Sequence, residues 1–239
     1  FPSDDNSLSV KNTIEKVDFK TGKSLSTNSF LTKSSSANLL YMSNENMYLT
    51  YNRYIDPFEI SLDFFVTQKD IFNDDFIAKL KYIDSLSISS GAKYYEINTV
   101  LTQYLEGLSR EESLKVSSNL QNNFNKFVEA NINKLVVTDI VKLSKSLEIT
   151  ARGSVSGYPL NQFSMDEYNG NLRIATNLEG NISAGYFYFN STIKSTNTVT
   201  VLDKDLKFLG EAVGLGSGER IYSARFVGDT AYIVTFRQT

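Results

Sequence analysis

The 239-residue chain has no histidine, no cysteine and no tryptophan. The absence of histidine excludes Ser-His-Asp and Cys-His nucleophilic sites, HExxH zinc sites and imidazole acid–base catalysis. The absence of cysteine excludes disulfides, thiolate catalysis, iron–sulfur clusters and zinc ribbons. It does not name a compartment, because a secreted protein with a large core folds without disulfides.

Charge and hydropathy argue against two further classes. The net charge is −3 at pH 7, the wrong sign for a nucleic-acid-binding protein unless one face is strongly basic. No run of eighteen apolar residues occurs, so the sequence predicts no membrane-spanning helix. The sequence starts at Phe1 and shows no charged-then-apolar leader, which indicates a processed or truncated start.

The sequence contains two kinds of hairpin that alternate. The first is a strand, a short turn such as Asn169-Gly170 that tolerates positive φ, and a second strand, over residues 37–52, 161–177 and 220–237. The second is an amphipathic strand, a polar turn and another strand, over residues 13–25, 139–149 and 198–210. Asp18, Ser144 and Asp203 occupy equivalent positions in this second kind. One hairpin of each kind makes a four-stranded unit.

A helical pattern interrupts this repeat over residues 56–136. Apolar residues recur at three- and four-residue steps from Tyr94 to Leu108, which predicts a helix. Ser109 and Glu112 have the spacing of a capping box and begin a second helix, and a shorter helix is predicted over residues 74–86. Without this segment, equivalent hairpins lie about 45 residues apart, the length of a propeller blade. We interpret the segment as a helical insertion packed against the blades, with a recognition arm as the alternative.

These patterns predict a mainly β protein with an α insertion: a partial β-propeller of about three blades' worth of four-stranded antiparallel sheets. The predicted division is propeller blades at residues 1–55, a helical insertion at 56–136, and further blades, incomplete at the C-terminus, at 137–239. The first and last hairpins could share one sheet. Because propellers close with about four to eight blades, we expect chain beyond these residues, or another subunit that covers the open edges.

Two stretches carry a family resemblance: LNQFSMDEYNG at residues 160–170 and GERIYSARFVGD at 218–229. With them the chain resembles a family of secreted, largely archaeal proteins with a C-terminal β-propeller domain. The resemblance covers residues 138–239 well and the N-terminal half loosely, and the helical insertion carries fewer charges than that family's helical segment. It implies a propeller that continues into further blades, an extracellular or cell-surface location, and no assigned catalytic residues.

The adjacent carboxylates Asp166 and Glu167 are candidates for an acid–base pair or for cation ligands. Neighbouring residues of a strand point to opposite faces of the sheet, so they do not readily converge on one substrate. We therefore expect one of them to hydrogen-bond backbone at the hairpin. Carboxylates from distant positions could still form a glycoside hydrolase pair, since spacing alone does not exclude that chemistry.

Three other segments resemble parts of known sites. Residues 203–205 and 73–75 resemble pieces of calcium loops but lack the twelve-residue order of ligands, so we interpret them as a turn and a helix start. The glycine-rich residues 214–218 lack a following Lys-Ser/Thr, which favours an inter-blade loop over a phosphate cradle. The aromatic residues 185–190 predict an added strand or a long loop, with the tyrosines in sheet packing.

Two N-x-S/T sequons begin at Asn181 and Asn190, in what the sequence predicts to be a surface loop. Two sequons in one loop of an apparently secreted protein favour glycosylation of both asparagines.

We therefore predict a non-enzymatic interaction or structural protein of the cell surface or extracellular space, with no catalytic, cofactor-binding or metal-binding residue. The expected partners are other protein chains or the missing remainder of the same propeller, and envelope glycans are further candidate ligands. The alternative is an extracellular carbohydrate-active hydrolase that uses carboxylates in the propeller funnel. A subunit of a filament or surface lattice is a third possibility.

Overall fold

The computed structural model describes residues 10–32, 39–53, 55–185 and 189–237. In this part of the chain the helical elements are α1 (Pro57–Phe65), α2 (Asp74–Ser85), α3 (Ser90–Glu106), α4 (Arg110–Leu135) and the short 3-10 helix η1 (Gln162–Ser164). The strands are β1 (Val10–Val17), β2 (Ser24–Thr32), β3 (Leu39–Met42), β4 (Asn46–Asn52), β5 (Val137–Ser144), β6 (Ile149–Ser156), β7 (Met165–Tyr168), β8 (Asn171–Ala184), β9 (Phe189–Leu202), β10 (Phe208–Leu215), β11 (Arg220–Val227) and β12 (Thr230–Phe236).

The chain forms two compact units. Unit 1 comprises Phe1–Tyr54, Val136–Gly180 and Lys194–Thr239, and unit 2 comprises Ile55–Leu135 and Asn181–Ile193. The helices α1–α4 all belong to unit 2, whereas β8 and β9 each contribute residues to both units.

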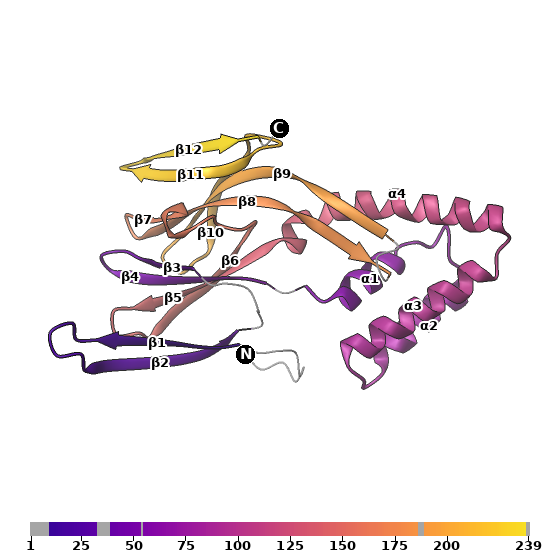
Figure 1. The fold of residues 1–239 in the computed structure, drawn as a ribbon, viewed down its shortest axis with the longest axis horizontal. Coiled ribbons are helices and arrows are strands. Elements are labelled where there is room, and N and C mark those ends of the chain that lie inside the picture. The colour runs from indigo at the N-terminus through magenta and orange to yellow at the C-terminus, as the bar shows by residue number, and fades with distance from the viewer. Residues whose placement is uncertain (1–9, 33–38, 54, 186–188, 238–239) are drawn as a thin grey trace. The chain divides into compact units, whose positions relative to one another are not determined.

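Unit 1 contains four antiparallel sheets (Figure 1). Two of them have four strands, in the orders β3-β4-β5-β6 and β10-β9-β8-β7, and each joins one hairpin of each predicted kind. The predicted four-stranded units are therefore confirmed. The possibility that the first and last hairpins share one sheet is wrong, because β1 pairs with β2 and β11 with β12 in two separate two-stranded sheets.

Successive sheets pack face to face through apolar clusters. Along β4, Tyr48 points toward the β7–β10 sheet, whereas Met47 and Leu49 point toward β1 and β2, because side chains alternate between the two faces of a strand. The three clusters that join the four sheets contain, in turn, Phe30, Met47, Leu49, Tyr51, Val141, Leu143 and Leu147; Tyr48, Ile140, Val155, Met165, Leu172, Ile174, Leu202 and Leu206; and Ala175, Ile221 and Ala224.

The polar turns of the second hairpin kind share one hydrogen-bonding pattern. Asp18 Oδ1 accepts from the backbone N–H groups of Lys20 and Thr21, at 2.7 and 3.0 Å. Asp203 Oδ1 accepts from two N–H groups at 2.8 and 2.9 Å, and Ser144 Oγ does the same at 3.2 and 3.3 Å. The predicted equivalence of the three positions is confirmed, and so is the interpretation of residues 203–205 as a turn.

Two of these turns also place a leucine in the left-handed backbone region. Leu147 has φ 68° and Leu206 has φ 61°, values that are uncommon for a bulky side chain. Both side chains are buried in the clusters between sheets, which holds the unfavourable backbone conformation in place.

The helical insertion in unit 2 confirms the expected helices and adds one. Asn73 caps α2 by accepting from Phe76 N–H at 2.9 Å, so residues 73–75 start a helix as predicted. The capping box also forms, since Ser109 Oγ accepts from Glu112 N–H and Glu112 Oε2 accepts from Ser109 N–H. Helix α1, which the sequence pattern missed, contributes the fully buried Phe64 and Phe65 to an aromatic core. None of the helices in the described ranges is long and apolar enough to cross a membrane.

Some of the aromatic residues 185–190 lie outside the described residues, namely 186–188. Phe189 is part of β9 and is buried against Phe64 and Phe65 within unit 2. Around these residues β8 and β9 are long strands of 14 residues each. The residues 214–218 comprise the end of β10 and most of its connection to β11, as expected for an inter-blade link.

Replacing Gly153 with alanine should loosen the contact between two neighbouring sheets. An added Cβ would lie 2.7 Å from both the Cβ and the carbonyl oxygen of Leu206, so the backbone of that turn would have to shift. Overpacking of this kind costs about 1–3 kcal/mol, which urea unfolding should register as a lower free energy of unfolding. Gly210→Ala is the matched control, because an added Cβ there meets nothing within 4 Å. Equal stability of the two variants would contradict the packing described.

Candidate functional site

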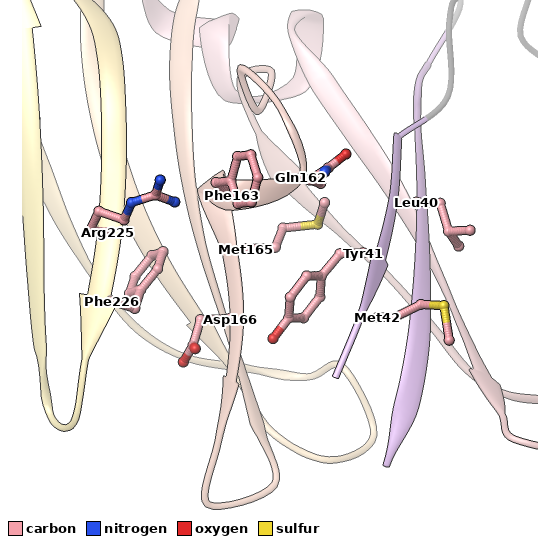
Figure 2. Close-up of a pocket in the computed structure, with 9 residues that line it drawn as sticks. All are labelled: Leu40, Tyr41, Met42, Gln162, Phe163, Met165, Asp166, Arg225 and Phe226. Carbon is pink, nitrogen blue, oxygen red and sulfur yellow. The ribbon is translucent and has the colours of Figure 1, made fainter. Parts of the chain in front are cut away.

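A groove of about 440 Å³ lies where β3, the η1–β7 segment and β11 come together (Figure 2). These elements begin three successive sheets, and β3 and β7 are edge strands, each paired on one side only. Both stretches that carry the family resemblance contribute to the lining. The lining residues are Leu40, Tyr41, Met42, Gln162, Phe163, Met165, Asp166, Arg225 and Phe226.

The short helix η1 positions one wall of the groove. A reciprocal pair of hydrogen bonds between Asn161 and Ser164 forms a capping box, and Asn161 Oδ1 also accepts from Phe163 N–H at 2.9 Å. This turn leaves Gln162 and Phe163 exposed, while the next residue to line the groove, Met165, is buried in the cluster between the sheets. The capping bonds thus hold an exposed ring and an exposed amide beside β11.

Asp166 is bound to Arg173, its cross-strand neighbour on β8. Asp166 Oδ2 accepts from Arg173 Nε at 3.0 Å and from Nη2 at 2.5 Å. The guanidinium lies 4.6 Å from the ring centroid of Tyr168 and 5.1 Å from that of Phe226 on β11. Since Arg173 is only 8% exposed, the pair is a structural contact that joins the β7–β8 hairpin to β11.

Glu167 points the other way, toward the β3–β4 hairpin. Its carboxylate accepts from the hydroxyl of Ser43 and from Asn46 Nδ2, the latter at 2.8 Å. Its backbone N–H donates to Tyr41 Oη at 2.9 Å. The prediction that Asp166 and Glu167 point to opposite faces is therefore confirmed. The expectation that one of them binds backbone is wrong for the bonds the structure shows, because Asp166 binds the side chain of Arg173 in its own hairpin and Glu167 binds side chains of the β3–β4 hairpin.

Arg225 supplies the positive charge of the groove. Its guanidinium lies 4.7 Å from the ring centroid of Phe163, and Figure 2 shows it directed from β11 toward that ring. Unlike Arg173, it forms no ion pair with any carboxylate in the described residues. It is therefore an exposed cation on an aromatic surface.

A second hollow of about 450 Å³ shares Tyr41, Met42 and Asp166 with this groove and lies between the β3–β4 and β7–β8 turns. It is more polar and is lined in addition by Ser43, Asn44, Glu45, Glu167, Asn169 and Gly170. Within the described ranges no group of three or more acidic residues is placed to hold a metal ion.

The two predicted glycosylation residues lie in strands, not in a loop. Asn181 belongs to β8 and Asn190 to β9, and both side chains are exposed. Asn190 Oδ1 accepts from the hydroxyl of Ser183, the serine of the first sequon, at 2.7 Å. Both sequons therefore stand on the same part of unit 2.

Of the residues that line the groove, only Asp166 was a candidate from the sequence; Tyr41 and Arg225 were missed, and so was Arg173, the partner of Asp166. The signal for Arg173 was present, because the Asn169-Gly170 turn places it directly opposite Asp166. No local signal identifies Tyr41, which contacts Glu167 across 126 positions of sequence.

Burial raises the pKa of Tyr48 far above its ordinary value of 10, and the negative charge of Glu167 adds to this effect. The side chain is fully buried in the cluster between two sheets. Its hydroxyl has no hydrogen-bond partner among the described residues. Burial also raises the pKa of the neighbouring Tyr41.

Comparison with known proteins agrees with the stacked sheets. A family model described as "Beta propeller domain" matches residues 1–239. The chain belongs to this beta-propeller family. An "Uncharacterized protein" of Archaeoglobus fulgidus is 37% identical over 227 residues, which cover 95% of this chain and 34% of the relative. "Uncharacterized protein MJ1554" of Methanocaldococcus jannaschii is 36% identical over 228 residues, 95% of this chain and 35% of the relative.

The propeller chain thus spans about a third of the length of these curated relatives. No solved structure matches it. The predicted resemblance to an archaeal propeller family is confirmed in its fold and in the archaeal origin of these two relatives.

Tyr48→Phe should weaken the alkaline destabilisation of the propeller chain. The folded state keeps Tyr48 protonated, whereas an unfolded tyrosine loses its proton near pH 10, so stability is retained below that pH and falls as the pH rises above it. Removing the hydroxyl should reduce the slope of unfolding free energy against pH by up to about 1.4 kcal/mol per pH unit. Urea unfolding from pH 8 to pH 11 measures the slope.

The control for this variant is Tyr82→Phe, because Tyr82 is 66% exposed. The two variants should differ in slope only above about pH 10. Identical slopes would show that the Tyr48 hydroxyl is not held in a buried, protonated state.

Proposed function

We propose that this chain is a sector of a larger β-propeller and acts as a non-catalytic interaction module. The observation that carries the proposal is the outer face of the β11–β12 hairpin. Its inner face packs on β8 through Ile221 and Ala224. The outer face presents five exposed apolar side chains instead, which are Tyr222, Val227, Tyr232, Val234 and Phe236.

The exposure of these side chains is high for a sheet face. They range from 44% exposed at Phe236 to 68% at Tyr222, and these two rings pack against each other edge to face at 5.8 Å. The β12 strand alternates regularly between exposed and half-buried residues, so one whole face lacks a covering layer among the described residues. An apolar face of this kind is typical of an interaction surface.

The occupant that fits this face is a further propeller blade. Each of the other sheet-to-sheet contacts in unit 1 buries apolar side chains of one face against the next sheet, and the β11–β12 face continues that series. The relatives are about three times as long as the region that they share with this chain, which leaves room for additional blades in proteins of this family.

The groove supports binding better than catalysis. An acid–base pair needs carboxylates that are free to exchange protons with a substrate between them. Asp166 is held by Arg173, Glu167 is held by Ser43 and Asn46, and the two point to opposite sides of β7. These engaged carboxylates favour the interaction module over the alternative of a carbohydrate-active hydrolase.

A double variant in which both Tyr232 and Val234 are changed to lysine should show less self-association of the isolated chain. If the outer face is an uncovered blade face, the 239-residue chain should self-associate with rising concentration and bind a hydrophobic dye. The double variant should do both at least about tenfold less, because two desolvated charges oppose burial of the face. Sedimentation equilibrium and dye fluorescence measure the two effects.

Tyr82→Lys together with Leu114→Lys is the matched control, since both residues are exposed apolar side chains of helices in unit 2. The control should associate like the unchanged chain. A chain that stays monomeric at high concentration, with dye binding unaffected by the β12 substitutions, would contradict the proposal.

We propose in addition that the protein works outside the cell or on its surface. The exposed sequon residues Asn181 and Asn190 support this location. The protein recovered from its native cells should be found in the medium or the envelope fraction, and its peptides should carry a glycan mass at both asparagines, as measured by mass spectrometry; each Asn→Gln change should remove one glycan. Intracellular protein with both asparagines unmodified would contradict it.

A further inference from the structure

We propose that the groove between β3, η1–β7 and β11 binds a carboxylate carried on an apolar peptide segment, with Arg225 as the group that recognises the carboxylate. This site adjoins the outer face of β11–β12, because Arg225 is the cross-strand neighbour of Tyr232, but none of the five apolar residues of that face lines the groove. Three features of the groove support the proposal: its unused hydrogen-bond donors, the apolar surface that surrounds them, and the charged groups that line it.

The first feature is a set of unused hydrogen-bond donors. Arg225 has five guanidinium N–H groups, and none of them donates to an acceptor in the described part of the chain. Gln162 lines the same groove with an exposed side-chain amide. A guanidinium with its fork of N–H groups open matches a carboxylate in a bidentate arrangement.

The second feature is the apolar surface around these donors. Phe163 is 53% exposed and stacks against Arg225, and Leu40 and Met42 on β3 are 43% and 63% exposed. Exposed aromatic and methionine side chains around a few polar groups are typical of sites for apolar ligands. The volume of about 440 Å³ also falls within the range of roughly 300–1,000 Å³ that is usual for such sites.

The third feature is the small number of charged side chains that line the groove. Among the described residues, the only acidic one that lines the groove is Asp166, and it is paired with the buried Arg173, so it does not compete for Arg225. No lysine of the described ranges lines the groove. A single exposed guanidinium therefore fits one carboxylate better than the closely spaced phosphates of a nucleic acid, which need several cations. The peptide carboxylate comes either from a chain end or from an acidic side chain.

The test uses three synthetic probes and the 239-residue chain. The first probe is an acetylated tripeptide, Ala-Ala-Phe, with a free C-terminal carboxylate. The second is the same tripeptide as its C-terminal amide, and the third is acetyl-Phe-Asp-Ala amide, whose only carboxylate is a side chain. Chemical-shift titration by nuclear magnetic resonance gives each dissociation constant, and adenosine monophosphate serves as a comparison ligand.

We expect at least one of the two carboxylate probes to bind about tenfold or more tightly than the amide probe. Arg225→Met should abolish this difference while it preserves the apolar stem, and Phe163→Ala should weaken binding of both kinds of probe. Arg110→Met is the control, because Arg110 is an exposed arginine at the start of α4 in unit 2. Preference for the first probe indicates a chain end, and preference for the third indicates an acidic side chain.

The proposal is overturned if no probe binds, if the amide binds as tightly as both carboxylates, or if Arg225→Met leaves the preference unchanged. It is also overturned if adenosine monophosphate binds more tightly than every peptide, since a phosphate site would then be indicated. Cooperative thermal unfolding of Arg225→Met at the temperature of the unchanged chain shows that any loss of binding arises at the groove. Should that variant unfold early, Arg225→Lys, which keeps the charge but not the fork, replaces it and should lose most of the preference.

Discussion

Burial of apolar side chains between stacked antiparallel sheets is the interaction on which the rest of unit 1 depends. A two-stranded hairpin is marginally stable by itself in water, so β1–β2 and β11–β12 exist because each lies on a four-stranded sheet. The β3–β6 sheet contributes Tyr48 to one cluster and Met47 to another, and it is therefore covered on both faces. Among the described residues, the last hairpin is covered on one face only, by the contacts of Ile221 and Ala224.

The same stacking creates the groove. Because the first strand of each sheet lies at an edge, the packing of three successive sheets brings β3, β7 and β11 together. Both carboxylates of β7 are engaged in polar contacts. Asp166 binds Arg173, which lies against the ring of Phe226, and Glu167 binds the β3–β4 turn. Arg225 contacts the ring of Phe163 and forms no ion pair with a carboxylate of the described residues, so the groove presents an unpaired positive charge on an aromatic surface.

Much of the fold could be predicted because its signals are local. Turn residues such as Asn169-Gly170 marked the hairpins, and Asp18, Ser144 and Asp203 marked the polar turns through side-chain bonds that span two to four residues. The capping box at Ser109 is equally local. Helix α1 was missed because it has only nine residues, and its apolar and polar residues alternate from Phe58 to Phe64, which is the pattern of a strand and not of a helix.

The groove could not be predicted in the same way. Its walls come from segments more than a hundred residues apart, and the partners of Glu167 depend on how two sheets pack. For residues 185–190 the sequence left an added strand and a long loop open, and it placed the two sequons in a surface loop, whereas Asn181 and Asn190 lie in strands. Here Phe189 packs into the aromatic core of unit 2 instead, and that tertiary contact outweighs the local signal.

Native-state hydrogen exchange of the 239-residue chain tests the stacked-sheet account most directly. Amides of β4, β5, β8 and β9, in sheets covered on both faces, should exchange slowest, and those of β11 and β12 should exchange markedly faster because one face of that hairpin is bare. Protection of β11 and β12 equal to that of β8 and β9 in the monomeric chain would contradict the open-ended stack.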